Sequence, residues 1–242
     1  MKQSLSLLAL ALALPSAPAL AGGLSGLSSL SDSEFNALSE AVGATVSYKP
    51  ILPPEPQGLS GFDIGVAMTS TSASLKGANA LDKAGASLHL DDAIQSYRLH
   101  INKGLPFGVD IGAVFTSVPS LGLDADGLEV RYALLSGDYA VPTISVRGAY
   151  TRVDESNHLS MDTRSVDLSI SKGFAMLTPY AGIGQIWVDS KGKGAASHLS
   201  DELELTKFYA GLNMTLGLVN VAFETDVTGS TTSWGLKMGV RW

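Results

Sequence analysis

A short segment near the end of the chain carries the residue types of nucleophilic catalysis. His198 and Ser200 are followed by Asp201 and Glu202, so a base, a hydroxyl group and two acids stand together. In an extended segment His198 and Ser200 would lie on the same side, where the imidazole could activate the hydroxyl. Polar loops often contain these residue types by chance. We therefore expect no catalytic residues and keep a lipid-modifying enzyme that uses His198 and Ser200 as an alternative.

A second segment has the residue types of a metal site. His89, Asp91 and Asp92 could together offer one imidazole and two carboxylates. In a polar loop such groups are more often solvated, so we expect no metal. The chain has no cysteine, which excludes disulfides, thiolate metal sites and cysteine nucleophiles. Nothing else in the sequence indicates a cofactor, and we expect none.

The composition argues against nucleic acid as a partner and points to β structure. The net charge is -7, whereas nucleic-acid binding requires clustered Lys and Arg. Charged residues make up 16% of the chain, against about 25% in soluble domains. The 26 glycines are scattered along the chain. A protein that turns one of its surfaces to lipid could be this poor in charge without any long apolar run.

From Ser60 onward apolar and polar residues alternate, which is the period of a β-strand. The alternation recurs in ten segments, each about as long as a tilted strand that crosses a membrane. In a narrow barrel the charges on the polar face would pair across the lumen, because an unpaired buried charge costs several kcal/mol. His100, beside Arg98, is interpreted as a hydrogen-bonding residue of the lumen. The predicted lumen charge network consists of Asp63, Arg98, Asp110, Glu129, Arg131, Arg147, Asp167, Lys207, Glu224, Asp226, Lys237 and Arg241.

The connections between these segments alternate in length. Short turns are predicted near 105–106, 137–138, 173–174 and 217–218, and longer polar loops at 71–93, 118–126, 154–162 and 189–202. This asymmetry is typical of membrane barrels, whose turns are short on one side. The sequence therefore predicts an all-β, antiparallel transmembrane barrel over 60–242. We expect about ten strands, or twelve if 44–49 and one more segment join, and keep a soluble periplasmic β-sandwich as the alternative.

The residues before the barrel fall into two parts. Residues 1–21 combine Lys2, an apolar run and Ala19-Leu20-Ala21, as a cleaved signal peptide does. Residues 22–59 are expected to form a periplasmic extension or a plug. Ser31 or Asp32 could cap a short helix there, and several prolines before Gly58 rule out regular structure.

The C-terminal segment gives the most specific signal. Trp234, Leu236, Met238, Val240 and Trp242 share one face, and the chain ends on an aromatic residue. This resembles the assembly signal of bacterial outer-membrane barrels, although that family prefers a final phenylalanine. The stretch 167–174 is also similar to a family of uncharacterised proteobacterial outer-membrane proteins, which implies no activity.

The resemblance to outer-membrane barrels implies the outer membrane of a Gram-negative bacterium. The implied partners are outer-membrane lipid and the barrel assembly machinery. We expect a non-enzymatic protein, either a narrow or gated conduit or a structural or surface-interaction protein. A small solute or a lipid is a possible ligand.

Overall fold

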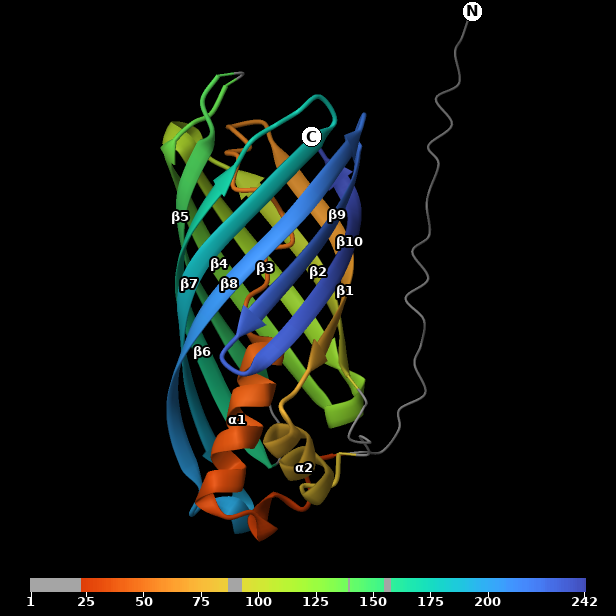
Figure 1. Ribbon diagram of the computed structural model, residues 1–242, viewed down its shortest axis with the longest axis vertical. Helices are drawn as coiled ribbons and strands as arrows, with labels where there is room; N and C mark the ends of the chain where they lie inside the picture. Colours follow the sequence, from red (N-terminus) through yellow and green to blue (C-terminus); the bar gives the residue numbers. More distant parts are fainter. Residues whose placement is uncertain (1–22, 87–92, 139, 155–157) are drawn as a thin grey trace, which may run out of the picture.

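Ten antiparallel strands close into a single barrel, in the order β1-β10-β9-β8-β7-β6-β5-β4-β3-β2 (Figure 1). The computed structural model describes residues 23–86, 93–138, 140–154 and 158–242. The predicted ten-strand barrel is confirmed, and both the twelve-strand version and the β-sandwich are wrong. The strands are β1 Phe62–Ser72, β2 Ile94–Gly104, β3 Val109–Val118, β4 Leu123–Leu135, β5 Thr143–Asp154, β6 Leu159–Ser171, β7 Leu177–Gly192, β8 Ser200–Leu216, β9 Val219–Thr228 and β10 Thr231–Arg241.

The part of the chain that the structure describes has two α-helices in addition to the barrel. α1 spans Asp32–Val46 and starts with a capping box between Ser31 and Glu34. α2 spans Leu75–Lys83, inside a segment expected to be a loop, and is capped by Ser74. None of the helices within the described residues is long and apolar enough to cross a membrane. Short 3-10 turns occupy Leu27–Ser29, Pro106–Gly108, Pro119–Leu121 and Gly194–Ala196.

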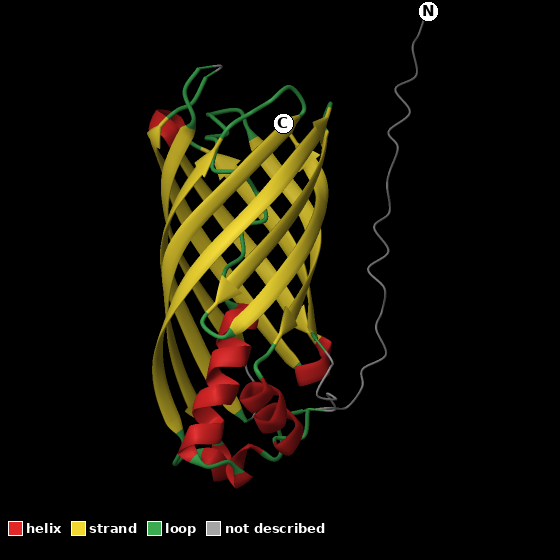
Figure 2. Cartoon of the chain, viewed as in Figure 1, coloured by secondary structure: helices red, strands yellow, loops and turns green. Residues whose placement is uncertain are grey.

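The two ends of the barrel differ (Figures 1 and 2). At one end, here called the turn end, β1 begins and the chain terminates. The backbone groups of Phe62 and Trp242 bond reciprocally there, at 3.2 and 2.9 Å, and their rings stack. The short β2–β3, β4–β5, β6–β7 and β8–β9 connections also lie at this end. The opposite end, here called the loop end, carries α1, α2 and the other connections.

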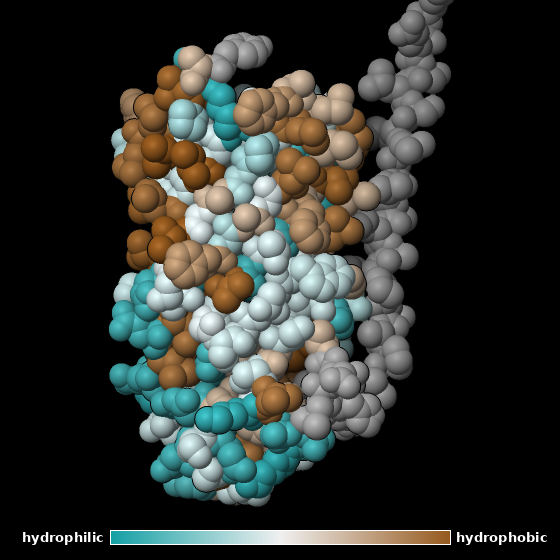
Figure 3. Space-filling model, viewed as in Figure 1, coloured by the Kyte–Doolittle hydropathy of each residue, from teal (hydrophilic) through white to brown (hydrophobic). Residues whose placement is uncertain are grey.

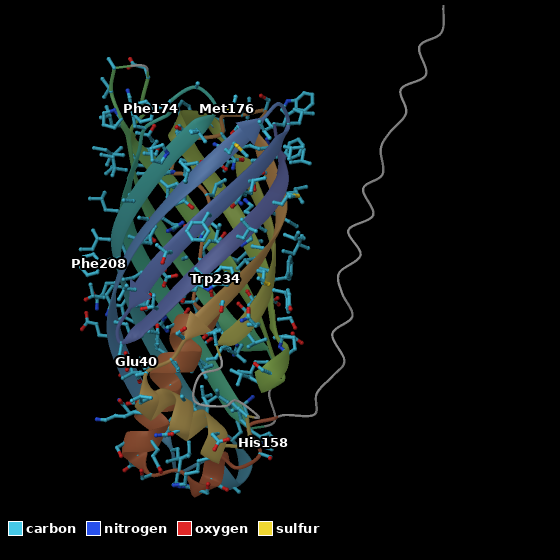
Figure 4. All side chains as sticks on the ribbon, turned by 45° about the vertical axis from the view of Figure 1, so that its right-hand side comes forward. Glu40, His158, Phe174, Met176, Phe208 and Trp234 are labelled. Atoms are coloured by element: carbon cyan, nitrogen blue, oxygen red, sulfur yellow. The ribbon has the colours of Figure 1, made fainter. Side chains whose placement is uncertain are left out.

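The outer surface changes character between the two ends (Figure 3). In the turn-end half most of the large outward residues are apolar, and the predicted C-terminal signal lies there with Trp234, Leu236, Met238, Val240 and Trp242 all exposed. Phe208 and Trp234 lie near mid-height, and Phe174 and Met176 at the turn end (Figure 4). Strands β6, β7 and β8 continue beyond the apolar half, so the loops are shorter than expected. Outward residues near the loop end are Asp124, Asp126, Arg152, Asp162, Arg164, Lys191, Glu202 and Glu204.

The interior also has two zones. Near the loop end many inward residues are apolar and pack against α1 in one hydrophobic cluster, with small hydroxyl residues such as Thr163 and Ser190 among them. Phe35, Leu38 and Val42 of α1 are buried against residues such as Ile186 and Val188 of β7. Burial of an apolar side chain of this kind contributes about 1.5–3 kcal/mol. Nearer the turn end the inward residues are charged or polar. The barrel is therefore closed at the loop end by a core resembling that of a soluble protein.

A buried ion pair joins the first strand to the last. Asp63 of β1 binds Lys237 of β10, and Asn220 of β9 donates to the same carboxylate at 2.9 Å. The Lys237 side chain crosses Gly65, where an added Cβ would lie 2.8 Å from its Cε. A glycine is required at that position to leave room for the lysine. This contact therefore fastens the seam at which the barrel closes.

Replacing Lys237 by methionine should destabilise the barrel by roughly 3 kcal/mol, because it leaves the Asp63 carboxylate buried without its cation. The measurement is urea unfolding of the refolded protein in lipid vesicles. The double variant Lys237→Met with Asp63→Asn should recover most of the loss, since no buried charge remains. Equal stability of the wild type and the single variant would show that the pair does not fasten the seam.

Candidate functional site

An extended segment passes through the barrel lumen. Residues 47–61, here called the strap, run from the end of α1 at the loop end to the start of β1 at the turn end (Figures 1 and 2). Residues 47–54 of the strap are buried. Pro50, Pro53, Pro54 and Pro56 lack an N–H group, so the strap has fewer backbone donors than carbonyl acceptors. The strap therefore suits a lumen whose wall supplies hydrogen-bond donors.

The barrel wall provides those donors. Carbonyls of strap residues 48–55 accept hydrogen bonds from four strands, and three of the donors are cations of the predicted lumen network. Because these contacts are made to backbone oxygens, they depend on the path of the strap more than on its side chains. The bonds are Lys207 to Tyr48 at 3.4 Å, Arg131 to Pro53 at 3.2 Å, Ser145 to Pro54 at 2.8 Å, and Arg241 to Glu55 at 3.4 Å.

Arg98 holds the junction between α1 and the strap. Its guanidinium donates to the Ser47 carbonyl at 3.1 Å and to the Thr45 carbonyl. Carbonyls at a helix C-terminus lack intrahelical partners and carry partial negative charge, so a cation stabilises them. Arg98 is 2% exposed, which strengthens this interaction by excluding water. It therefore fixes where the helix ends and the extended path begins.

One strap side chain forms a buried ion pair with the wall. Lys49 Nζ lies 2.6 Å from an Asp226 oxygen of β9 and donates to Ser233 at 3.1 Å. Both charged side chains are almost completely buried. Thr228 donates to the same carboxylate at 2.9 Å. Removing either charge would leave the other without its salt-bridge partner, so Lys49 is a strong side-chain anchor of the strap.

The other wall acids bind wall donors. Arg147 binds Asp167 at 2.7 Å and Glu129 at 3.5 Å, and the Tyr209 hydroxyl donates to Asp167 at 2.8 Å. Arg131 binds Asp110 at 2.6 Å, and the Tyr180 hydroxyl donates to Glu224 at 3.0 Å. The structure places every residue of the predicted network inside the barrel. All twelve are buried except Arg241, which is half-buried.

The sequence left open whether residues 22–59 form a periplasmic extension or a plug, and it did not show which wall residues the strap would contact. Ile51 of the strap packs with Ala67 and Ala222 of the wall, and an added Cβ on Gly235 would lie 2.9 Å from its Cδ1. These small inward residues were a signal that sequence reasoning could have used, because small side chains on the wall leave space for another segment in the lumen. Ile51 also has a φ of 44°, an unusual conformation for a β-branched residue.

The loop-end part of the N-terminal segment is tied to the wall by polar contacts. The Ser190 hydroxyl of β7 donates to Ser39 at 2.7 Å, and Glu40 accepts from the Ser230 N–H at 2.6 Å. Lys83 of α2 binds Glu34 of α1 at 2.8 Å. That ammonium and the Ser31 N–H lower the pKa of the Glu34 carboxyl from 4.5 to about 2. The stabilisation that the Glu34 carboxylate gives to the contact between α1 and α2 is therefore fully present above pH 4.5 and is lost as the pH falls through about 2.

His198 and Ser200, the residues considered for catalysis, are not assembled into a site with an acid. His198 and Ser200 are both exposed at the loop end, where Ser200 begins β8. His89, Asp91 and Asp92 lie outside the described residues. Within the described ranges no group of histidines and acids could hold a metal ion. His100 faces the lumen, edge-on to the Tyr48 ring, but its two nitrogens have no hydrogen-bond partner among the described residues.

Replacing Lys49 by alanine should loosen the strap, because the strap then loses its ion pair with Asp226 of the wall. A cysteine introduced at buried Leu52 provides the probe, since the chain has no other cysteine. We expect that cysteine to react with a small thiol reagent at least about tenfold faster in the Lys49→Ala background. Exposed Lys76→Ala is the matched control. Equal rates in both backgrounds would mean that Lys49 does not anchor the strap.

Comparisons with known proteins give a fold likeness only. No family model and no curated protein matches the chain. A solved structure of KdgM porin is 10% identical, covers 74% of this chain and 98% of its own, and has a TM-score of 0.38. Ail of Yersinia pestis is 13% identical, with 75% and 97% covered and a TM-score of 0.31. Neisserial surface protein A is 10% identical, with 75% and 94% covered and a TM-score of 0.34. At these values the likenesses give no information about what this chain binds or does.

Proposed function

We propose that this chain is a sealed, non-enzymatic barrel of a Gram-negative outer membrane that acts as a structural or surface-interaction protein. The observation that carries the proposal is the strap, which occupies the lumen and is bound to the wall by buried polar contacts. Its proposed partners are outer-membrane lipid and the machinery that assembles barrels. The apolar outer half and the aromatic C-terminal face support both partners.

The size of the barrel supports a closed lumen. In eight-stranded barrels side chains alone fill the interior, and ten strands add only a little width. Here Arg98, Arg131 and Arg147 already reach inward, and the strap lies among them. At the loop end α1 fills an apolar zone that would be unfavourable to line with water. An open aqueous path would require both the strap and α1 to leave.

A gated conduit is the second candidate, and specific features favour it. The backbone of the strap is strained at Ile51. In addition, three buried oxygens of the lumen have no hydrogen-bond partner among the described residues: Tyr48 Oη of the strap, and Asn102 Oδ1 and Glu224 Oε1 of the wall. A pocket of about 490 Å³ opens at the turn end between the strap residues Glu55 and Pro56 and neighbouring turns. A small solute or a periplasmic partner could reach the strap there. The lipid-modifying enzyme is not favoured, because His198 and Ser200 are not gathered in a cavity.

Planar-bilayer recording of the purified protein tests the sealed state. We expect the wild type to show no steady conductance and a variant lacking residues 23–58 to conduct continuously, because the deletion removes α1 and most of the strap. The deletion variant is used only if its unboiled form still migrates differently from its boiled form in electrophoresis. Proteoliposome swelling in small sugars provides an independent measurement.

Each outcome separates the candidates. A steadily conducting wild type would overturn the sealed barrel and favour a conduit. A silent wild type with a conducting deletion variant would support the strap and α1 as the seal. A folded but silent deletion variant would show that wall side chains alone close the lumen. That result would contradict the role given to the strap.

A further inference from the structure

We infer that residues 23–46 are displayed on the outer face of the cell, because the chain threads its own barrel from outside to inside before β1 begins. This inference rests on the proposed outer-membrane location. An N-terminal extension would ordinarily be expected on the periplasmic side, where β1 starts. The structure places α1 at the opposite end (Figure 1).

Contacts hold the start of the chain at the loop end. The Gly26 N–H donates to the Ala84 carbonyl at 2.8 Å, which joins the N-terminal residues to the segment after α2. Leu24 and Leu27 are buried in the same hydrophobic cluster as Leu121 and Leu199, which lie in or beside loop-end connections. Glu40 reaches the β9–β10 connection, and Figure 4 places it near the loop end. Residues 24–46 are therefore integrated into this end of the barrel.

The path from there to β1 runs through the lumen. Residues 47–54 are buried, and their neighbours along the way are inward residues of β2, β4, β5, β8 and β9. The ten strands form a closed ladder, so the strap is surrounded by wall. The barrel must therefore close around the strap during assembly, or the strap must enter before closure is complete.

The orientation of the barrel then decides which side α1 occupies. Membrane barrels keep short turns on the periplasmic side and longer connections outside, and here the long β1–β2 connection, which contains α2, lies at the loop end, whereas the other connections are short at both ends. The apolar outer surface lies toward the turn end, and the loop end projects beyond it with a charged outer surface. The C-terminal Trp242 also lies at the turn end. All three features assign the loop end, with α1 and α2, to the exterior.

Cysteine labelling of intact cells tests this arrangement, since the natural chain has no cysteine. Single variants Asn36→Cys on α1, Ser197→Cys beside β8 and Ser136→Cys at the turn end place a thiol at exposed positions. A membrane-impermeant maleimide is applied before and after the outer membrane is permeabilised. We expect Asn36→Cys and Ser197→Cys to be labelled on intact cells, and Ser136→Cys to be labelled at least about tenfold more after permeabilisation.

The outcomes distinguish this inference from the proposed function. If Ser197→Cys is labelled on intact cells but Asn36→Cys only after permeabilisation, the barrel is oriented as assigned and the threading is wrong. If Ser136→Cys alone is labelled on intact cells, the orientation is reversed and surface display is wrong. Fractionation of the same cells checks the location separately. A protein absent from the outer-membrane fraction would overturn the proposed location, and with it the surface display.

Discussion

Every charge and backbone carbonyl inside a narrow barrel must find a partner, because water is largely excluded there. An unpaired buried ion costs several kcal/mol, and an unsatisfied polar group about 1–3 kcal/mol. The wall alone does not meet this requirement. Asp226 needs Lys49 of the strap, and Arg98, Lys207 and Arg241 donate to carbonyls of the N-terminal segment. The wall and the segment inside it are therefore complementary, and neither is complete without the other.

This constraint explains why the N-terminal segment changes character along its length. In the apolar zone it is a helix, which satisfies its own backbone and presents Phe35 and Leu38 to the wall. In the polar zone it is extended and rich in proline, which removes donors and leaves carbonyls for the wall cations. The change occurs at Ser47, where Arg98 binds the last turn of the helix. The same boundary separates the half of the barrel that has an apolar outer surface from the half that projects beyond it.

The sequence predicted the barrel well because its signal is local. Alternation at period two assigns each strand residue to a face, so all twelve lumen charges could be named without knowing their partners. The partners of these charges could not be predicted, because Lys49 and Asp226 are 177 positions apart and no local pattern connects them. α2 was missed within a long loop, because its nine residues give little periodic signal. Strands β7 and β8 were predicted too short, because beyond the apolar half they carry charges outside and look like loops.

The central claim is that α1 sits inside the barrel mouth, and a disulfide tests it most directly. The hydroxyl oxygens of Ser39 on α1 and Ser190 on β7 are 2.7 Å apart, so a Ser39→Cys, Ser190→Cys variant has two nearly adjacent thiols in an otherwise cysteine-free chain. The account predicts that this disulfide forms in the native membrane. It would be seen as a mobility change of the boiled, non-reduced protein that thiol reduction abolishes. A folded, heat-modifiable barrel whose two thiols stay unlinked under mild oxidation would contradict the account.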